Sequence, residues 1–410
     1  MKLFVALFLP MMALATTRVA PNSGSSGQAW AWGNNLSGQI GLNSSTAIPA
    51  PQVVSGLKGV VTVSAGYDFV LAVTASGHVW SWGDEADGRL GNGQTSYAAV
   101  PTPRQISGLS QIRQISAGYD QALALTKSGR VYAWGSDQGG DLGVPSNSQC
   151  NCVDVPTEIP DLQNVAQVSV GGGFSDCKDC ASEFSVALKS DGTVWAWGTN
   201  GEGELGADPG STYISTVPRR IRGLTDVIAI AAGAGHVLAL TKAGKVWTWG
   251  DDQYGQLGDG AFCGPYNCLS WTPSQVPGLT SIRLIAAGGN DSAAITAKGE
   301  VWTWGDSYDD QLGDGVSCSS QTNRNCASNR PVHVVHLHHI IGIAVGSSHM
   351  IALRSDHSVW CWGDNLWDEL GRPSPPYPNS PIPETPGTNQ DQTKQVSAGY
   401  GFSVALRNAG

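Results

Sequence analysis

Charged residues are scarce in this sequence of 410 residues: they make up 14%, and the formal net charge is −10. Lysine and arginine gather in no cluster, which argues against nucleic acid and anionic membranes as partners, because affinity for phosphate comes largely from these side chains. Beyond the N-terminus, no apolar run approaches the roughly 20 residues that a membrane-spanning helix needs. No long polar tract is present either, so the composition is that of a globular protein.

The sequence also lacks the motifs of common catalytic sites. It contains neither a Gly-x-Ser-x-Gly nucleophile elbow nor a His-Glu-x-x-His zinc motif. The glycine-rich segments, such as residues 201–206, have no following lysine and no helix behind them, so we interpret them as turns rather than phosphate loops. No segment after residue 20 has a convincing helical period. We therefore predict no catalytic residue, no metal, no cofactor and no enzymatic activity.

Residues 1–20 are predicted to be a signal peptide. Lys2 gives a positive start, Leu3–Leu14 is almost wholly apolar, and Ala15 ends a small-x-small cleavage site, with a second site after Ala20. A buried N-terminal strand is the alternative. We expect a secreted or otherwise extracytoplasmic protein.

The dominant signal is an internal repeat. An aromatic-x-Trp-Gly motif recurs at intervals of 50 to 63 residues and holds 13 of the 15 tryptophans. Its copies lie at residues 30–33, 80–83, 132–135, 195–198, 247–250, 302–305 and 360–363. A period near 50 with fixed aromatic residues and glycines is typical of a propeller or a solenoid.

Each repeat contains four short strands separated by glycine-rich turns. In the second repeat the strands are predicted at residues 61–64, 70–74, 79–82 and about 100–106, because these segments are apolar or alternate with period two. No other type of secondary structure is indicated, so the fold class is all-β.

The two ends of the chain complement one another within the repeat. Val404–Gly410 aligns with Leu71–Gly77, and Gly27–Trp32 aligns with the continuation of that repeat, Gly77–Trp82. We therefore predict a single domain over residues 27–410. It is a seven-bladed β-propeller of four-stranded blades, closed by a composite blade from both termini, which removes open sheet edges.

The recurring elements Ala-Gly-x-x-His/Phe-x-x-Ala-Leu, Ser/Ala-Gly-x-Val-Trp-x-Trp-Gly and Gly-x-Leu-Gly resemble the regulator-of-chromosome-condensation repeat. The resemblance runs from about Gln28 to the last residue. It implies a seven-bladed propeller with a composite blade and, as function, protein binding on one propeller face. Members include an exchange factor for the GTPase Ran, modules of ubiquitin ligases and a secreted β-lactamase inhibitor. The signal peptide indicates an exported, bacterial-type member, so we do not transfer the exchange activity.

Carboxylates follow the Trp-Gly motif in several repeats, for example Asp84 and Glu85, Asp251 and Asp252, and Asp364. Short polar side chains at such positions accept hydrogen bonds from turn amides. A calcium site is the alternative. Because each group belongs to a different repeat, we favour a turn-stabilising role.

Half of the eight histidines lie close together in the chain, at His333, His336, His338 and His339. They fall in the connection between two repeats, and we favour a polar turn over a metal site because no Cys or carboxylate has ligand-like spacing to them. His236 and His349 stand where other repeats have Phe69 and Phe402, which indicates packing or the bracing of a loop.

Eight of the nine cysteines fall in local pairs, and we predict that they form disulfides. The pairs are Cys150 and Cys152, Cys177 and Cys180, Cys263 and Cys268, and Cys318 and Cys326. The first four residues allow cross-linking between the two pairs, or a zinc site, so the connectivity stays open. Cys361 is left over as a buried free thiol.

One face of the predicted ring carries the longer loops. The connections between the first and second strands and between the third and fourth strands emerge together there, with all eight paired cysteines. Aromatic residues predicted to bind a partner on this face are Tyr67, Tyr119, Phe174, Tyr254, Tyr266, Trp271, Tyr308 and Trp367. Rigid loops lose little entropy on binding, and aromatic residues make good anchors.

We therefore predict an exported, macromolecule-binding monomer that uses this cysteine-braced face to bind an unidentified protein or a polysaccharide. It inserts into no membrane and binds no nucleic acid. The alternatives are a carbohydrate-active hydrolase or lyase with a polar site at the propeller axis, and a carbohydrate-binding module.

Overall fold

The computed structural model describes residues 27–408 except 147–149, 175–180, 262–267, 319–325, 374–378 and 388–391. These residues form 28 β-strands and one short 3₁₀ turn, η1 (Ala86–Gly88). The all-β prediction is confirmed. Within the described residues, no helix has the length and apolar character needed to cross a bilayer.

The strands fall into four sets, each made of strands at equivalent places in the repeats. The first strands are β3 (Val60–Ala65), β7 (Ile112–Ala117), β11 (Val165–Phe174), β15 (Val227–Ala232), β19 (Ile282–Gly288), β23 (Ile340–Val345) and β27 (Thr393–Ala398). The second strands are β4 (Phe69–Thr74), β8 (Gln121–Thr126), β12 (Ala181–Lys189), β16 (His236–Thr241), β20 (Asp291–Thr296), β24 (His349–Arg354) and β28 (Phe402–Asn408).

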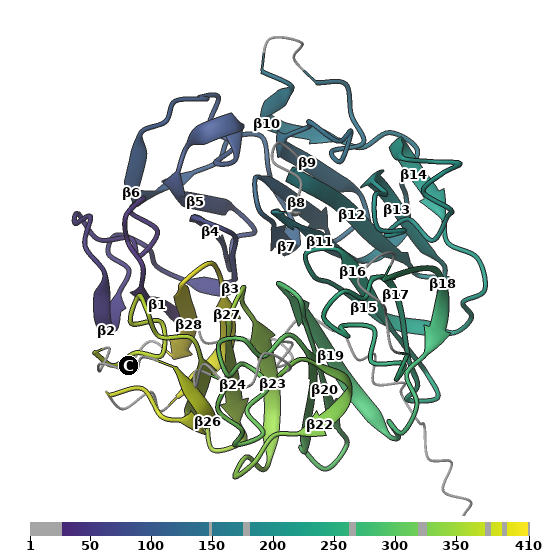
Figure 1. Ribbon diagram of the computed structural model, residues 1–410. Coiled ribbons are helices and arrows are strands. Elements are labelled where there is room, and N and C mark those ends of the chain that lie inside the picture. Colours follow the sequence, from purple (N-terminus) through teal and green to yellow (C-terminus); the bar gives the residue numbers. More distant parts are fainter. Residues whose placement is uncertain are drawn as a thin grey trace, which may run out of the picture.

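The third strands carry the Trp-Gly motif, and the fourth strands lie outermost (Figure 1). The third strands are β5 (Val79–Asp84), β9 (Val131–Ser136), β13 (Val194–Thr199), β17 (Val246–Asp251), β21 (Val301–Gly305), β25 (Val359–Gly363) and β1 (Gly27–Gly33). The fourth strands are β6 (Ala99–Gln105), β10 (Cys152–Glu158), β14 (Ile214–Arg220), β18 (Leu269–Gln275), β22 (Ser328–His333), β26 (Ser380–Glu384) and β2 (Ile48–Val53).

Consecutive strands pair antiparallel into sheets that surround a central channel (Figure 1). Five sheets, from β7–β10 to β23–β26, have four strands each. An eight-stranded sheet joins β3–β6 to a group in the order β27-β28-β1-β2, and the strand pairing between the two groups is Gly27 opposite Val60. The five four-stranded sheets agree with the four-stranded repeats predicted from the sequence.

The two ends of the chain pair with each other. β1 lies antiparallel to β28 over seven consecutive residue pairs, from Gly27 opposite Asn408 to Gly33 opposite Phe402. β28 in turn pairs with β27, and β1 pairs with β2. The strands from both ends of the chain thus form one continuous group in the sheet.

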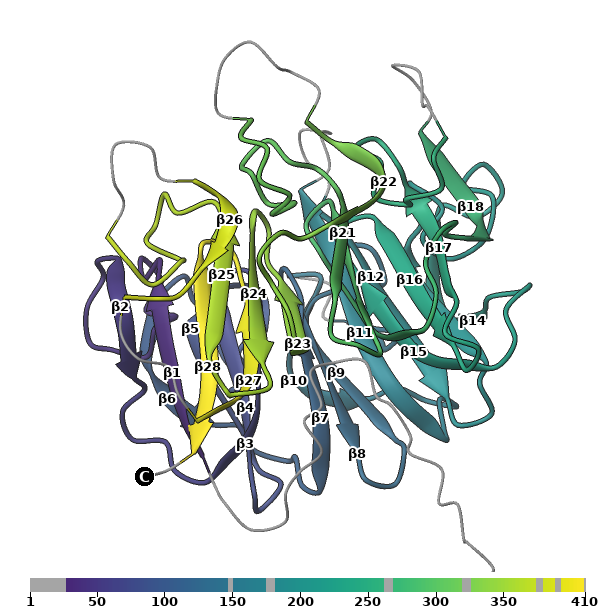
Figure 2. The same cartoon turned by 90° about the horizontal axis from the view of Figure 1, so that it is seen from below.

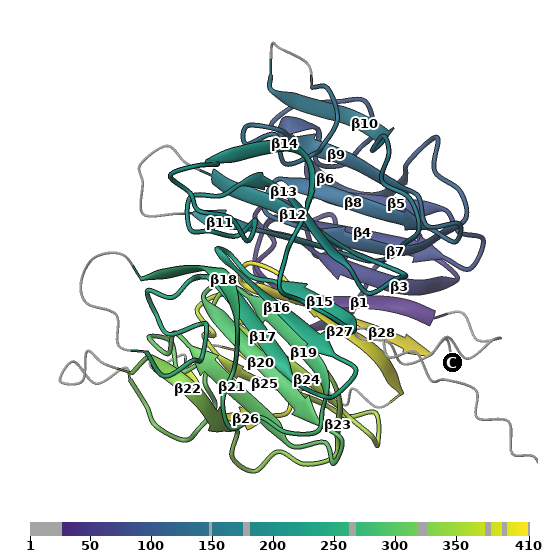
Figure 3. The same ribbon diagram turned by 90° about the vertical axis from the view of Figure 1, so that its right-hand side faces the viewer.

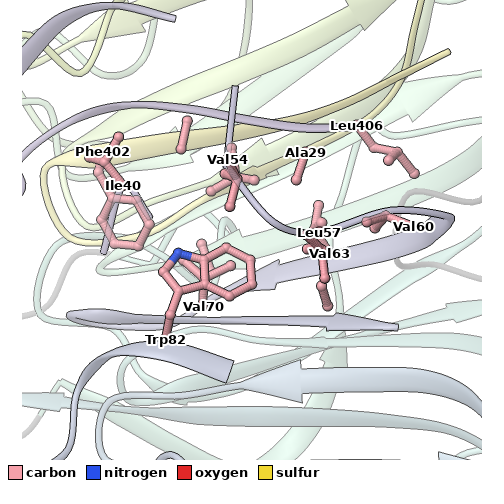
Figure 4. Close-up of a cluster of buried hydrophobic side chains, with 14 residues drawn as sticks. Ala29, Ile40, Val54, Leu57, Val60, Val63, Val70, Trp82, Phe402 and Leu406 are labelled. Atoms are coloured by element: carbon pink, nitrogen blue, oxygen red, sulfur yellow. The ribbon is translucent and has the colours of Figure 1, made fainter. Parts of the chain in front are cut away.

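The core lies between adjacent sheets. Second strands such as β4 are buried along their whole length because each is covered on both faces, which explains their uninterrupted apolar runs. Figure 4 shows Trp82 packed among Ile40, Val54 and Val70. Cys361, in the equivalent core of another repeat, is a buried free thiol, as predicted.

The second tryptophan of each motif ties its sheet to the preceding one. These seven side chains are fully buried, and six of them donate an Nε1 hydrogen bond to a main-chain carbonyl in the connection between the third and fourth strands of the neighbouring sheet. Trp82, for example, donates to the carbonyl of Gln39 at 2.9 Å. Because a buried indole N–H needs a partner, this contact explains why tryptophan recurs here.

The glycine after this tryptophan is required by the backbone. Gly83 has a φ of 114°, and a Cβ atom there would lie 2.4 Å from the carbonyl oxygen of Asp68. The Trp-Gly motif is therefore a structural signature of the sheet.

Candidate interaction face

The connections between strands separate into two faces, because neighbouring strands are antiparallel. We call the side with the first-to-second and third-to-fourth connections the loop face, and the opposite side the turn face. Contacts between the two kinds of connection show that they share one face: Gln39 Nε2 donates to Asp68 at 2.8 Å, and Arg89 lies 2.7 Å from Asp120. In Figures 2 and 3 the strands run from one face to the other, and β28 ends on the turn face.

Polar side chains brace the third-to-fourth connections of the loop face. Asp251 accepts a hydrogen bond from the amide two residues further on at 2.9 Å, and Asp252 accepts one from the amide five residues further on at 2.9 Å. Gln256 accepts one from the amide two residues before it, at 2.8 Å. The same three bonds recur from Asn34, Asn35 and Gln39 and from Asp364, Asn365 and Glu369. The turn-stabilising role predicted for these carboxylates is confirmed.

Two of these bracing positions hold buried glutamates where other repeats have glutamine. Burial raises the pKa of Glu204 to about 8, and burial together with the charge of Asp364 raises the pKa of Glu369 to about 8. Glu204 Oε2 accepts the Glu202 amide at 2.9 Å, whereas Oε1 has no hydrogen-bond partner. Each glutamate therefore makes the same structural hydrogen bond as a glutamine, with an added cost of desolvating its charge.

A buried arginine organises an acidic cluster on the loop face. Arg89 takes the position of Gln39 in its own repeat and lies 3.1 Å from Asp84, 3.5 Å from Asp87 and 2.7 Å from Asp120. Burial raises the pKa of Asp120 to about 6. No group of three or more metal-ligating side chains is positioned to hold an ion within the described residues.

Three tyrosines meet at the loop-face mouth of the channel. The ring of Tyr67 lies 4.1 Å from that of Tyr119 and 4.3 Å from that of Tyr400, with which it is stacked. Burial raises the pKa of Tyr119 to about 12. The structure brings together Tyr67 and Tyr119, both predicted site residues. Tyr400 was missed, although the Gly-Tyr pair that precedes the second strand occurs in all three repeats.

The other predicted aromatic residues differ in exposure. Tyr308 is 79% exposed and Trp271 is 42% exposed, whereas Tyr254 and Trp367 are half-buried. Phe174 ends β11 and Tyr266 lies outside the described residues.

Two exposed leucines on the loop face were also missed. Leu36 is 56% exposed and Leu366 is 64% exposed, and both occupy the position that Tyr308 has in its own repeat. Alignment of the repeats would have found them, since all three residues stand three positions after the motif glycine. They belong to consecutive repeats and so form an arc on the loop face next to Tyr400, which is 39% exposed.

The described disulfides lie in third-to-fourth connections. Cys150 is bonded to Cys152, the first residue of β10, and Cys318 is bonded to Cys326 before β22. The first bond is a local pair and not the cross-link to a second pair that the sequence also allows. Cys268 precedes β18, and Cys177, Cys180 and Cys263 lie outside the described residues.

The histidines have structural roles. His236 and His349 are buried, and each Nε2 lies 2.9 Å from a serine hydroxyl of the next repeat, on Ser292 and Ser403 respectively. Burial lowers their pKa values to about 3 and about 4. His339 adopts a left-handed backbone conformation in the connection between repeats, in agreement with the predicted polar turn.

The central channel has a volume of about 1470 Å³ and is lined by the first strands of the repeats. Its walls are mainly Val, Ala, Ser and Gly. Among the described residues that line it, Asp306 is the one carboxylate.

Models of one protein family match nearly the whole described chain. Residues 178–410 match the RCC1-like domain, and residues 26–73, 76–125 and 128–177 match the regulator of chromosome condensation (RCC1) repeat. Among solved structures, Prp20p of Saccharomyces cerevisiae is similar with a TM-score of 0.78 and 24% identity, over 95% of this chain and 93% of that one. Human WBSCR16 is similar with a TM-score of 0.76 and 22% identity, over 93% of this chain and 100% of that one. These similarities show the fold, a β-propeller.

Curated proteins are also similar in sequence. The E3 ubiquitin-protein ligase HERC2 of Mus musculus is 32% identical over 362 residues, which are 85% of this chain but 7% of HERC2. The mitochondrial RCC1 domain-containing protein RUG3 of Arabidopsis thaliana is 31% identical over 350 residues, 80% of this chain and 73% of RUG3. The chain thus spans a small part of HERC2 and most of RUG3. By its repeats, its fold and these relatives, the chain belongs to the regulator of chromosome condensation (RCC1) repeat family.

Proposed function

We propose that this chain is an exported protein-binding propeller whose loop face holds the partner. The ring has seven blades and is closed by a composite blade of β27, β28, β1 and β2. The pairing of β1 with β28 supports this closure. Seven residues with left-handed backbone, each before a first strand, support the blade number: Gly59, Gln111, Asn164, Asp226, Ser281, His339 and Gln392.

The observation that carries the binding proposal is the arc of exposed apolar side chains on the loop face. Tyr308, Leu366 and Leu36 project from consecutive connections, and Tyr400 with the tyrosine cluster lies beside them. When a partner covers such exposed apolar side chains, their removal from water contributes about 25 cal/mol of binding free energy for each Å² of apolar surface buried. The hydrogen bonds that brace the connections hold these anchors in place before binding, which limits the entropy lost.

The nature of the relatives supports a protein as the partner. Prp20p has been characterised by its binding to Gsp1p and histones, and yeast RCC1 (Prp20) has been solved with Kap60 bound. Similarity to these propellers favours a binding role for the ring itself. The identity of the partner does not follow from them.

Export and cysteine bracing belong to the same proposal. Disulfides persist in oxidising compartments and are rare in the cytosol, so the Cys150–Cys152 and Cys318–Cys326 bonds agree with the signal peptide predicted at residues 1–20. Both bonds lie in connections of the loop face, where they stiffen the binding surface.

The test is affinity capture followed by measurement of the dissociation constant for each captured protein. The variant combines Leu36→Ala, Tyr308→Ala and Leu366→Ala. The control combines Val155→Ala and Val217→Ala, which remove exposed side chains from the outer strands β10 and β14. We expect the control to bind like the unaltered chain and the loop-face variant to bind at least about tenfold more weakly. Equal binding by all three chains would refute the proposed face.

A further inference from the structure

Charge is divided between the two faces of the ring. Carboxylates crowd the connections of the loop face, around Arg89 and after most of the Trp-Gly motifs. Basic side chains instead gather on the turn face. Exposed examples are Lys58, Lys127, Arg222, Lys242 and Lys298, which form no ion pair within the described residues.

Acidic residues on the turn face are fewer and partly neutralised. Glu158 is paired with Arg130 at 3.0 Å, and Asp356 is paired with Arg354. Four further acidic residues lie on this face: Asp161, Asp191, Asp226 and Glu300. The basic residues outnumber them, since half-buried ones such as Lys189 and Lys245 add to the five exposed ones named above. The turn face is therefore positively charged, although the chain as a whole carries −10.

One turn structure is repeated around the turn face. In the turn after β8 the Thr126 amide donates to the Arg130 carbonyl at 2.9 Å, and the Lys127 amide donates to the carbonyl of Gln111 at 2.9 Å. The corresponding bonds recur in the turns after β4, β12, β16, β20 and β24. Lys127 and Lys242 hold the same position in this repeated turn, and Lys298 stands one position later in its own turn.

The acidic loop face does not cancel this charge at physiological salt. Strands of six residues, such as β8, separate the faces by about 20 Å of sheet before the connections are added. The Debye length is about 8 Å at 0.15 M ionic strength, so each face acts on its surroundings almost independently. The net charge of the chain sums both faces and therefore predicts repulsion from anionic membranes. The separation of the faces instead predicts that the turn face attracts them.

We propose that the turn face docks on an anionic lipid bilayer. The exposed lysines and arginine on this face are complementary in charge to a layer of negative headgroups, and each basic residue near such a surface adds about 1 kcal/mol of attraction. Docking is peripheral and leaves the loop face pointing away from the bilayer. The proposal is independent of the partner of the loop face.

The test is cosedimentation of the full chain with vesicles of phosphatidylglycerol and phosphatidylcholine in equal parts, and with vesicles of phosphatidylcholine alone. The variant combines Lys127→Glu, Lys242→Glu and Lys298→Glu, and the matched control places arginine at the same three positions. Unfolding temperatures verify that all three chains fold alike. At 0.1 M salt we expect the unaltered chain and the arginine control to bind the anionic vesicles, and the glutamate variant to bind about a hundredfold more weakly.

Salt separates this docking from insertion of the apolar residues 3–14, which all three chains share. We expect 1 M salt to release the unaltered chain from anionic vesicles, because screening removes a charge-based contact. Absence of binding, equal binding to phosphatidylcholine alone, or equal binding by the glutamate variant would each overturn the proposal. Binding of the chain to heparin without binding to anionic vesicles would overturn it too, since the face would then recognise a soluble polyanion.

Discussion

The buried glutamates of the loop face give a prediction about stability and pH. Replacing Glu204 by glutamine keeps the oxygen that accepts the Glu202 amide and removes a buried carboxylate. Gln256 shows that the site accepts an amide: its oxygen accepts the Tyr254 amide at 2.8 Å and its Nε2 donates to Asp251 at 2.8 Å. We therefore expect Glu204→Gln to stabilise the folded state at pH values high enough to ionise the Glu204 carboxyl group.

The magnitude follows from the raised pKa. The pKa of Glu204 is about 8 in the folded chain and 4.5 in an exposed glutamate, so the folded state holds the proton more tightly. Its contribution to stability is complete at low pH and is lost as the pH rises towards 8. Each pKa unit between folded and unfolded states corresponds to about 1.4 kcal/mol, so Glu204 costs about 3 kcal/mol more at pH 8 than at pH 5.

Urea unfolding at pH 5 and pH 8 measures this effect. We expect Glu204→Gln to raise the free energy of unfolding by about 3 kcal/mol at pH 8 and by less than about 1 kcal/mol at pH 5. The reverse change, Gln256→Glu, should lower stability at pH 8 far more than at pH 5. Other titrating groups are common to all chains and cancel in the comparison. An effect of Glu204→Gln that is the same at both pH values, or a loss of stability at pH 8, would refute the reasoning.

Three further changes test the packing. Gly83→Ala should unfold the chain or lower its melting temperature sharply, because the new Cβ meets the Asp68 carbonyl. Gly56→Ala, in open space, should lower the free energy of unfolding by about 1 kcal/mol, and equal losses for the two variants would contradict the structural role of the Trp-Gly motif. Trp304→Ala should lower the free energy of unfolding by about 3 to 5 kcal/mol in urea, and a loss below about 1 kcal/mol would count against the inter-sheet contact. Replacing Cys318 and Cys326 by serine should lower the free energy of unfolding by at most about 3 kcal/mol, measured in the same way, because their loop is short. A clearly larger loss would mean that the bond supports more than its own loop.

The sequence predicts the strands well because each repeat carries the same physical requirements. Trp82 must be buried and find an acceptor, Gly83 must adopt a positive φ, and β4 must be apolar on both faces. The turn role of Asp251 and its equivalents was predictable for the same reason, since the position after the motif is fixed.

The surfaces were harder to predict, because exposure and charge depend on how the strands cross the ring. Tyr254 and Trp367 were expected at the binding face but are half-buried, and Leu36 and Leu366 were overlooked because single exposed leucines are unremarkable in a sequence. The basic turn face was missed because lysines such as Lys127 are far from one another in the chain and gather only when the sheets are placed around the channel.

The central claim is that a protein partner covers the loop face. Hydrogen exchange of the chain alone and in complex with a captured partner tests it most directly. We predict slower exchange on binding in the connections that contain Leu36, Tyr308 and Leu366, with no change in the turns at 127–130 and 242–245. Protection confined to those turns, or to the first strands that line the channel, would contradict the account.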